Sequence, residues 1–282
     1  MKTTIVRVSL FAIGATAAFA AAAHAQGSAA SWTGGYVALS AGSAKVSNRN
    51  SGLTFDTNAD GAYGDTVHDF TGADYFAPGF CQGTAKGQTP SAGCTKDSHK
   101  GGVGIRAGYD MQTGHWVYGA VVDVSSLKLR DSVSAFSTAP DSYTFSRELK
   151  TLTAVRGRLG WGESKWLVYA TAGFASADMK RGFATTNALN SFTALRTNTA
   201  NGGQLGAGAE WRFAHNWTVG VEYLNTSLRD HGPVVLAQGS ANTFASNAFL
   251  TASPEGTAMR RSDTHFRFDT VSLTLSYRFG AM

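Results

Sequence analysis

The stretch VGIRAGYDMQTGHWVYGAVVDV, residues 103–124, decides the fold. Its first half places Val103, Ile105, Ala107, Tyr109 and Met111 on one side and Gly104, Arg106, Gly108 and Asp110 on the other. A period of two is that of a β-strand with two different faces. Polar residues 112–115 then separate this run from a second alternating run that begins at Trp116. We therefore interpret the stretch as a β-hairpin of which one face can contact lipid and the other cannot.

The same pattern recurs along the whole chain and predicts eight antiparallel strands. They begin near Trp32, Gly101, Trp116, Leu149, Trp166, Gly203, Trp217 and Arg267. Short turns near 110–116, 161–166 and 213–217 alternate with long loops at about 46–99, 128–148, 178–201 and 226–265. Transmembrane β-barrels have short periplasmic turns and long extracellular loops, whereas a soluble sandwich has no reason to alternate them. The rhythm predicts an all-β, eight-stranded transmembrane barrel with both chain ends on the periplasmic side.

The tryptophans support this arrangement. All six lie at strand ends beside the short turns or the N-terminus: Trp32, Trp116, Trp161, Trp166, Trp211 and Trp217. Indole rings prefer the boundary between headgroups and hydrocarbon, where barrels carry an aromatic girdle. We predict that these six residues form the inner girdle.

The N-terminus has the three parts of a secretory signal peptide. Basic Lys2 and Arg7 precede an apolar run at 8–23, and the run ends in Ala-His-Ala at 23–25. A transmembrane helix would need about 20 apolar residues and a different flank. We predict that residues 1–25 are cleaved after export and that residues 26–282 form one barrel domain.

Composition and charge narrow the function classes. The chain has 33 Gly, 17 Phe, 9 Tyr and 6 Trp but only 5 Pro, which suits many strands joined by polar loops. The formal charge of +5 is too small and too dispersed for a nucleic-acid partner. Export to an oxidising compartment favours a disulfide between Cys81 and Cys94 in the first loop, the alternative being two unrelated thiols.

Charged residues on the inner faces of the strands form the candidate site. They are Arg106, Asp110, Asp123, Arg156, Arg158, Glu210, Arg212, Glu222 and Arg278. A barrel of about eight strands is only wide enough for side chains to fill it, so these charges must meet each other or trapped water. An internal ion-pair network is one interpretation, and a gated path for ions through that network is the other.

Several segments resemble a known family. Four stretches resemble the porin-family outer-membrane β-barrels that include the opacity proteins and the surface antigens of alphaproteobacteria: LTAVRGRLGW (152–161), WLVYATAGFA (166–175), GAGAEWRFAHNWTVGVEYLNTSL (206–228) and VSLTLSYRF (271–279). The resemblance implies a bacterial outer-membrane location and insertion by the outer-membrane assembly machinery. It also implies a C-terminal assembly signal at Tyr277 and Phe279. The chain departs from the pattern by adding Gly280, Ala281 and Met282 after Phe279.

The function predicted from these features is that of a structural or porin-like surface protein, with limited passage of ions or small solutes. The alternative is a loop-mediated adhesin or ligand-binding protein, because loops on a rigid scaffold carry binding functions. Basic residues of the later loops could meet anionic lipopolysaccharide at the outer leaflet: Lys180, Arg181, Arg229, Arg260 and Arg261.

Enzyme chemistry is the most distant reading. Ser262, Asp263 and His265 supply the residue types of an activated nucleophile at the predicted outer rim, where an acyl-modifying enzyme would act. Their adjacency on a strand does not create hydrogen-bond geometry. No histidine pair has zinc-ligand spacing, and GGVGIRAG (101–108) lacks the helix that a phosphate-binding loop needs. The sequence therefore predicts no catalytic residues, no metal and no cofactor.

Overall fold

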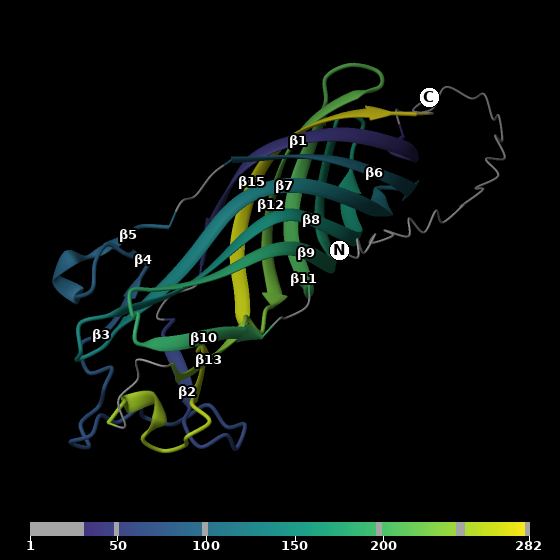
Figure 1. The fold of residues 1–282 in the computed structure, drawn as a ribbon. Helices are drawn as coiled ribbons and strands as arrows, with labels where there is room; N and C mark the ends of the chain where they lie inside the picture. Colours follow the sequence, from purple (N-terminus) through teal and green to yellow (C-terminus); the bar gives the residue numbers. More distant parts are fainter. Residues whose placement is uncertain (1–30, 48–50, 98–100, 196–198, 241–245, 280–282) are drawn as a thin grey trace, which may run out of the picture.

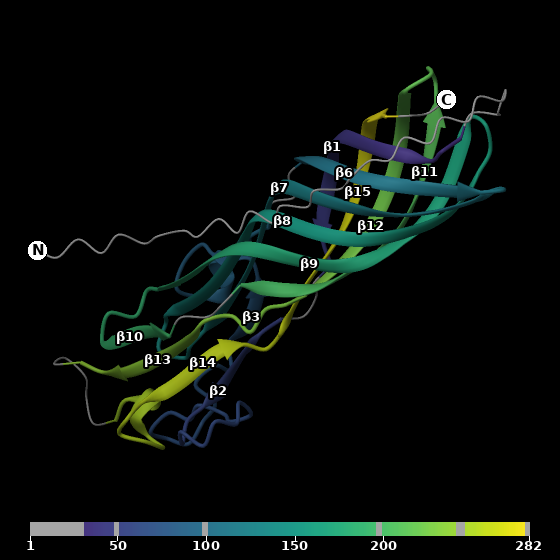
Figure 2. The ribbon, with the colours of Figure 1, turned by 90° about the vertical axis from the view of Figure 1, so that its right-hand side faces the viewer.

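The computed structural model describes residues 31–47, 51–97, 101–195, 199–240 and 246–279. The predicted signal peptide and the extension Gly280–Met282 lie outside the described residues. Eight long strands form a closed antiparallel ring in the order β7-β6-β1-β15-β12-β11-β9-β8, with β8 paired back to β7 (Figures 1 and 2). Their bounds are β1 (Gly34–Val46), β6 (Gly101–Thr113), β7 (Trp116–Phe136), β8 (Ser142–Gly162), β9 (Trp166–Thr185), β11 (Ala200–Arg212), β12 (Trp217–Arg229) and β15 (His265–Arg278). The predicted all-β, eight-stranded barrel is confirmed.

The period of two decides which side chains face outward. On β6, Val103 and Ile105 expose more than half of their surface, while Arg106 between Ile105 and Ala107 is buried. The same alternation holds on the last strand, where Leu273 is exposed and Ser272 and Thr274 are buried. The lower part of the barrel is thus apolar outside and polar inside, as a membrane-spanning barrel requires.

The strands extend well beyond the apolar band, so the predicted loops at about 128–148 and 178–201 are shorter than expected. β8 begins at Ser142 instead of Leu149, and only residues 137–141 separate it from β7. Above the band the polarity inverts: outward residues such as Lys128 and Arg130 are exposed, and Leu127 and Leu129 point inward and are buried. This part of the barrel is surrounded by water, so its outward side chains are polar and its inward side chains are apolar because they pack against each other. A pattern of apolar outward residues therefore does not predict these strand ends.

A second sheet of four strands lies beyond the ring, at the end opposite the short turns (Figures 1 and 2). Its order is β10-β13-β14-β2, with bounds β2 (Leu53–Asp56), β10 (Asn190–Leu195), β13 (Val234–Gly239) and β14 (Thr257–Arg261). Its strands come from three of the regions predicted to be loops. We call it the extracellular sheet.

The first predicted loop also contains short elements. These are β3 (Gly79–Gln82), β4 (Thr84–Ala85), the 3₁₀ turn η1 (Pro90–Ala92) and β5 (Cys94–Thr95); a second turn, η2 (Ala248–Leu250), precedes β14. β3 pairs with the upper end of β7. The predicted disulfide between Cys81 and Cys94 is present and joins β3 to β5.

Two apolar clusters fill the upper part of the molecule. One crosses the barrel and the other lies under the extracellular sheet, where the ring of Phe76 contacts those of Phe55, Tyr143 and Phe249. No helix among the described residues is long and apolar enough to cross a membrane.

Candidate functional site

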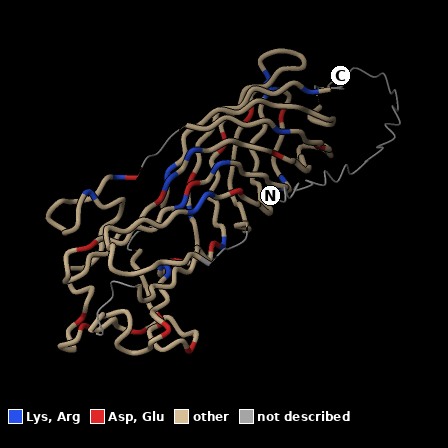
Figure 3. The backbone as a smooth tube through the Cα atoms, in the orientation of Figure 1, with Lys and Arg blue, Asp and Glu red and all other residues tan. Residues whose placement is uncertain are grey.

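The nine inward charges predicted from the sequence all lie inside the ring and expose 8% or less of their surface. They come from β6, β7, β8, β11, β12 and β15, where each takes the inward parity of its strand. Figure 3 shows basic and acidic positions along the strands of the barrel. The structure brings eight of the nine into two linked groups.

Glu222 organises the first group. One of its carboxylate oxygens accepts from Arg106 at 2.8 Å, and the other accepts from the hydroxyl of Tyr169 at 2.9 Å. Arg156 lies 3.3 Å from Glu222 and donates to Asp123 at 2.6 Å. Each guanidinium thus faces a carboxylate from a different strand, which ties β6, β7, β8 and β12 together across the interior.

Asp110 and Glu210 organise the second group. Arg278 donates to Asp110 at 2.5 Å, and Nε of Arg158 lies 3.1 Å from the same carboxylate. Arg158 also donates to Glu210 at 2.9 Å and to the hydroxyl of Tyr36 at 3.1 Å. Buried charges cost several kcal/mol each when single, so this pairing keeps the lumen stable.

Arg212 is the ninth inward charge and does not join a carboxylate among the described residues. It donates to the backbone oxygen of Ser31 at 2.7 Å and lies 4.5 Å from the ring of Trp32. Arg278 lies 4.8 Å from the same ring. Cation–π contacts and a backbone acceptor take the place of an ion pair here.

The prediction that Trp32 belongs to the aromatic girdle is wrong. The side chain is fully buried and lies with Val117, Leu167 and Tyr169 at the short-turn end of the interior. Its indole donates to the backbone oxygen of Glu163 at 2.6 Å. Residue 32 shares the inward parity of Tyr36 and Ala38, so the alternation itself assigns it to the lumen.

The other five tryptophans lie outside, at the ends of strands beside the short turns. Trp116, Trp161, Trp166, Trp211 and Trp217 each expose 41 to 57% of their surface. Trp116 contacts Trp161, and Trp166 contacts Trp211, across neighbouring strands. Tyr277 and Phe279, the residues of the implied assembly signal, continue this row, because Tyr277 packs on both Trp217 and Phe279.

An apolar layer crosses the barrel above the two charged groups. It draws on seven of the eight ring strands and consists of Ala44, Leu127, Leu129, Leu149, Leu152, Ala154, Ala175, Ala177, Met179, Ala200, Leu228, Phe266 and Phe268. Below it is a cavity of about 40 Å³ beside Arg106 and Asp123. That space has room for only a few water molecules.

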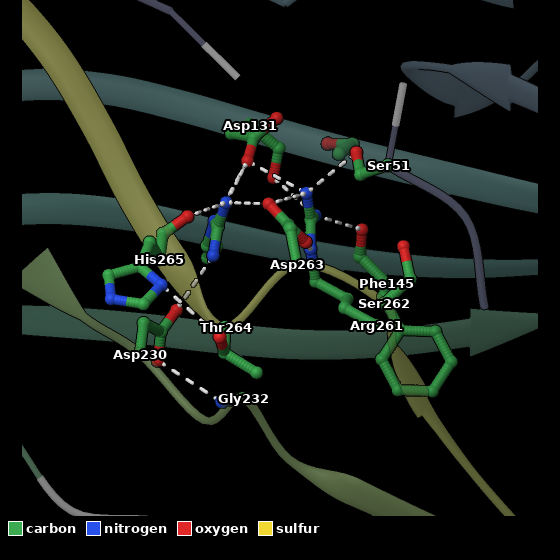
Figure 4. Close-up of polar contacts among 12 residues, drawn as sticks. Ser51, Asp131, Phe145, Asp230, Gly232, Arg261, Ser262, Asp263, Thr264 and His265 are labelled. Atoms are coloured by element: carbon green, nitrogen blue, oxygen red, sulfur yellow. Dashed lines mark hydrogen bonds and ion pairs between the residues drawn. The ribbon is translucent and has the colours of Figure 1, made fainter. Parts of the chain in front are cut away.

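A third charged group, which the sequence does not predict, lies above this layer, and Figure 4 shows its polar contacts. Arg147 reaches three carboxylates, those of Asp131 at 2.7 Å, Asp263 at 2.5 Å and Asp230 at 3.2 Å. Arg261, on β14 of the extracellular sheet, binds Asp131 and Asp263 at 2.8 Å each. Arg181 binds Asp230 at 2.6 Å. We call these six residues the upper network, and they link the extracellular sheet to β7, β8, β9 and the connection after β12.

The interior is therefore stacked in charged and apolar layers along β7 and β8. The order from the short-turn end is Asp123, Leu127, Leu129, Asp131 on β7 and Arg156, Leu152, Leu149, Arg147 on β8. A charged residue that interrupts the inverted alternation at 131 or 147 is the signal that could have found the upper network.

The upper network changes two predictions. Asp263 accepts from Arg147 and Arg261, while the hydroxyl of Ser262 accepts from the backbone nitrogen of Gly52. His265 Nδ1 contacts the hydroxyl of Thr264 at 3.2 Å. Ser262, Asp263 and His265 thus point to different partners. Arg181 and Arg261 face the interior and not the outer leaflet, in contrast to the prediction that they meet lipopolysaccharide.

Asp230 shows the electrostatics of this group. Burial alone would raise the pKa of its carboxyl, but the guanidiniums of Arg147 and Arg181 outweigh burial and hold the pKa below its ordinary value. The carboxylate is completed by the backbone nitrogen of Gly232 at 3.2 Å. The Asp230 carboxyl therefore stays ionised at neutral pH. With three arginines and three aspartates, the upper network carries no net formal charge.

Comparison with known proteins identifies relatives over almost the full length. Residues 11–279 match the family model described as outer membrane protein beta-barrel domain. The 31 kDa outer-membrane immunogenic protein of Brucella melitensis is 28% identical over 255 residues, which cover 88% of this chain and 84% of the relative. The 22 kDa outer membrane protein of Rhizobium leguminosarum bv. viciae is 31% identical over 135 residues, 47% of this chain and 56% of the relative. Among solved structures, the outer membrane protein OprG from Pseudomonas aeruginosa aligns with 88% of this chain and 98% of its own, at a TM-score of 0.48 and 11% identity.

Proposed function

The chain belongs to the outer membrane protein β-barrel domain family, and we propose on this premise that it is a structural surface protein whose closed barrel holds an extracellular β-sheet. Its relatives are named outer-membrane proteins, and the protein resides in the bacterial outer membrane. The observation that carries the proposal is the continuity of β7, β8 and β9, each 20 or 21 residues long, from the tryptophan girdle to the extracellular sheet.

The length of these strands supports a rigid connection. On β7, Trp116 and Val124 bound the apolar outward band, which spans eight residues and therefore about 26 Å along the strand, or about 20 Å along the membrane normal at a typical tilt. The strand continues for twelve residues above Val124 and remains paired with β8 to its end. Arg261 of the upper network then fixes β14 to the barrel interior. This arrangement supports a rigid extracellular sheet carried by the barrel, in place of flexible surface loops.

Passage of ions or solutes is less well supported. The apolar layer would have to separate before water could join the cavity near Arg106 to the upper network. An enzyme role is also less well supported, because Ser262 and His265 do not share a hydrogen bond among the contacts of the described residues. We propose that the barrel does not conduct and has no catalytic function.

Ligand binding by the extracellular sheet and its loops is the second candidate. Phe70 exposes 75% of its surface, and Phe80 and Leu189 expose close to half. Large apolar side chains exposed to water mark interaction sites, because a partner that covers them removes their surface from water. If the protein is an adhesin, vesicles that carry it attach to a target surface through these side chains. The double variant Phe70→Ser and Phe80→Ser should then abolish this attachment while the barrel stays folded.

Lipopolysaccharide is the partner that the outer surface favours. Directly above the apolar band, neighbouring strands present Lys128, Arg130, Lys150 and Lys180 outward. Lys128 follows Val124 by four residues, about 10 Å higher along the membrane normal. We propose that these four residues, the basic collar, contact the phosphates of lipopolysaccharide. Lys180 and Arg229 are both among the residues that the sequence predicts for this contact, and Arg229 is exposed at the end of β12.

Thiol labelling on intact cells tests the proposed function. The described residues contain no free cysteine, so a single introduced cysteine is the only thiol among them that a maleimide can label. Thr193→Cys on β10 should react with a membrane-impermeant maleimide on whole cells, whereas Ser164→Cys in a short turn should react only after the outer membrane is permeabilised. Equal labelling of both positions on intact cells, or labelling of Ser164→Cys alone, would contradict the proposal.

A further inference from the structure

A tight bend follows β2 at the outer edge of the extracellular sheet. Its sequence is DTNADG, residues 56–61. The bend is closed where the backbone nitrogen of Asp65 donates to the oxygen of Phe55 at 3.1 Å. Ala59 and Gly61 both have positive φ angles, of 61° and 83°, which lets the chain turn sharply between these two ends.

The spacing of oxygen side chains in this bend is that of a calcium loop. Calcium-binding loops of the form D-x-N-x-D-G use the first, third and fifth side chains as ligands, and the glycine at the sixth position allows the turn. Here those positions are Asp56, Asn58, Asp60 and Gly61. In such loops the backbone carbonyl at the seventh position, here that of Ala62, is a further ligand.

The side chains are already oriented around the bend. The nitrogen of Gly61 donates to Oδ2 of Asp56 at 2.9 Å, so the Asp56 carboxylate points across the bend. The nitrogen of Asp60 donates to Oδ1 of Asn58 at 3.0 Å, and the nitrogen of Ala62 donates to Oδ1 of Asp60 at 2.7 Å. Asp56 and Asp60 therefore each keep one carboxylate oxygen for an outside partner, and Oδ1 of Asn58 keeps its second lone pair.

The second oxygen of Asp56 is an independent sign that a cation belongs here. Asp56 exposes only 5% of its surface, and its Oδ1 is buried without a hydrogen-bond partner. Another buried oxygen that lacks a hydrogen bond, Oδ1 of Asp110, lies 3.1 Å from the guanidinium of Arg158. By contrast, Asp56 forms no ion pair with any described residue. A buried carboxylate oxygen without a partner is costly, and a bound cation removes that cost.

Asp65 offers the carboxylate that such a site needs at its open side. The twelfth position of the loop, where calcium loops carry a glutamate, is Val67. Oδ2 of Asp65 accepts from the nitrogen and the hydroxyl of Thr57 at 2.8 and 2.9 Å, which holds the Asp65 carboxylate against the residue that follows Asp56. Its other oxygen can complete the ligand set.

We propose that residues 56–65 form a calcium site in which Asp56, Asn58, Asp60, the carbonyl of Ala62 and Asp65 bind the ion. The oxygen ligands favour calcium over zinc or copper, which prefer imidazole and thiolate. Among the described residues, no three His, Cys, Asp or Glu side chains already converge on a metal position, so the ion must draw the carboxylates of Asp56, Asp60 and Asp65 together when it binds. This places the expected dissociation constant near that of extracellular modules, about 10⁻⁴ to 10⁻³ M.

The site would act on the packing of the extracellular sheet. Phe55, next to Asp56, stacks on Phe76 with ring centroids 4.5 Å apart and belongs to the buried cluster under the sheet. Asp56 itself pairs with Ala258 of β14. Calcium bound at the bend therefore fixes the edge strand β2 against β14 and the cluster below. This role goes beyond the proposed surface function and does not depend on it.

Terbium luminescence on the whole mature protein tests the site. Tyr63 lies within the bend, under the guanidinium of Arg260 at 3.8 Å, and can sensitise a lanthanide bound there. The protein is refolded in detergent without lipopolysaccharide, which itself binds calcium, and is freed of metal with a chelator. Terbium should bind at one site per chain and be displaced by calcium. Tyr63→Phe should lower the emission but leave the calcium affinity, measured by calorimetry, unchanged.

Two variants and a matched control decide the outcome. Asp56→Asn with Asp60→Asn, and separately the exposed Asn58→Ala, should each weaken calcium binding at least about tenfold. Asp69→Asn, an acidic residue of the same region whose carboxylate closes its own turn on Thr71, should bind as the unmodified protein does. Heat modifiability on a denaturing gel confirms that each variant folds. Undiminished binding by Asn58→Ala, or no binding by the unmodified protein up to about 10 mM calcium, would overturn the proposal.

Discussion

Replacing Glu222 by glutamine removes the charge on which the first charged group depends. Glu222 is the only carboxylate among the described residues within 4 Å of Arg106, and both side chains expose 7% or less. The amide keeps an acceptor oxygen and the shape, so the change leaves the Arg106 guanidinium buried without a counter-charge. Breaking a buried ion pair in this way costs about 3 to 5 kcal/mol. We expect the lower end, about 3 kcal/mol, because one hydrogen bond to the amide oxygen survives.

Two matched variants set the scale. In Asp123→Asn, Arg156 still lies 3.3 Å from Glu222, so the loss should be smaller, about 1 to 2 kcal/mol. Asp178→Asn changes an exposed outward carboxylate of β9 and should stay within about 0.5 kcal/mol of the unmodified protein. The order of stability should be Asp178→Asn, then Asp123→Asn, then Glu222→Gln.

Urea unfolding of the barrel in lipid vesicles measures this order, with the fluorescence of the girdle tryptophans as the signal and gel mobility of unboiled samples as a second readout. A loss of about 3 kcal/mol lowers the unfolding midpoint and raises the unfolding equilibrium constant about a hundredfold. If Glu222→Gln unfolds with the same midpoint and slope as Asp178→Asn, the charged groups do not stabilise the lumen and the reasoning fails.

Three further predictions concern other parts of the molecule. The pKa of Asp230 in the folded protein lies below the ordinary value of 3.8, so its stabilising contribution is complete above pH 3.8 and is lost as the pH falls through the lower folded pKa. Limited proteolysis should therefore cut the extracellular sheet more readily as the pH falls below about 4. Asp230→Asn should weaken this dependence of proteolysis on pH. Changing Lys128, Arg130, Lys150 and Lys180 together to glutamine should reduce the lipopolysaccharide retained on the purified protein, whereas changing Lys86 and Lys96 should not, and equal retention by both sets would argue against the basic collar. Trp32→Ala should cost about 3 to 5 kcal/mol of unfolding free energy, because it leaves a cavity at the short-turn end of the interior. The variant should still show no conductance, because the apolar layer is intact. A loss under about 1 kcal/mol would mean that the packing of Trp32 does not stabilise the barrel.

Much of the barrel follows from the sequence because lipid imposes one rule on every strand that crosses it. Outward residues such as Val103 and Leu273 must be apolar, and the charges between them, such as Arg106, must point inward. The same rule locates all nine inward charges. Their pairing across strands depends on the order and register of the ring, which alternation alone does not give.

Two kinds of feature were missed for identifiable reasons. The upper ends of β7 and β8 alternate in the opposite sense, with Leu129 inward and Arg130 outward, because they stand in water around an apolar layer. The position of Trp32 in the chain predicts the girdle, whereas its shared parity with Tyr36 places it in the lumen. Reading parity strictly, and allowing its polarity to invert, predicts both.

Single-channel conductance in a planar lipid bilayer tests the central claim, that stacked charged and apolar layers close the barrel. The refolded mature protein should insert and show no stable current steps, and charge reversal at Arg156 or Glu210 should not create any, because the layer of Leu149, Phe266 and Phe268 lies above both residues. Stable steps from the unmodified protein, altered in size or ion preference by charge reversal at Arg156 or Glu210, would contradict the account.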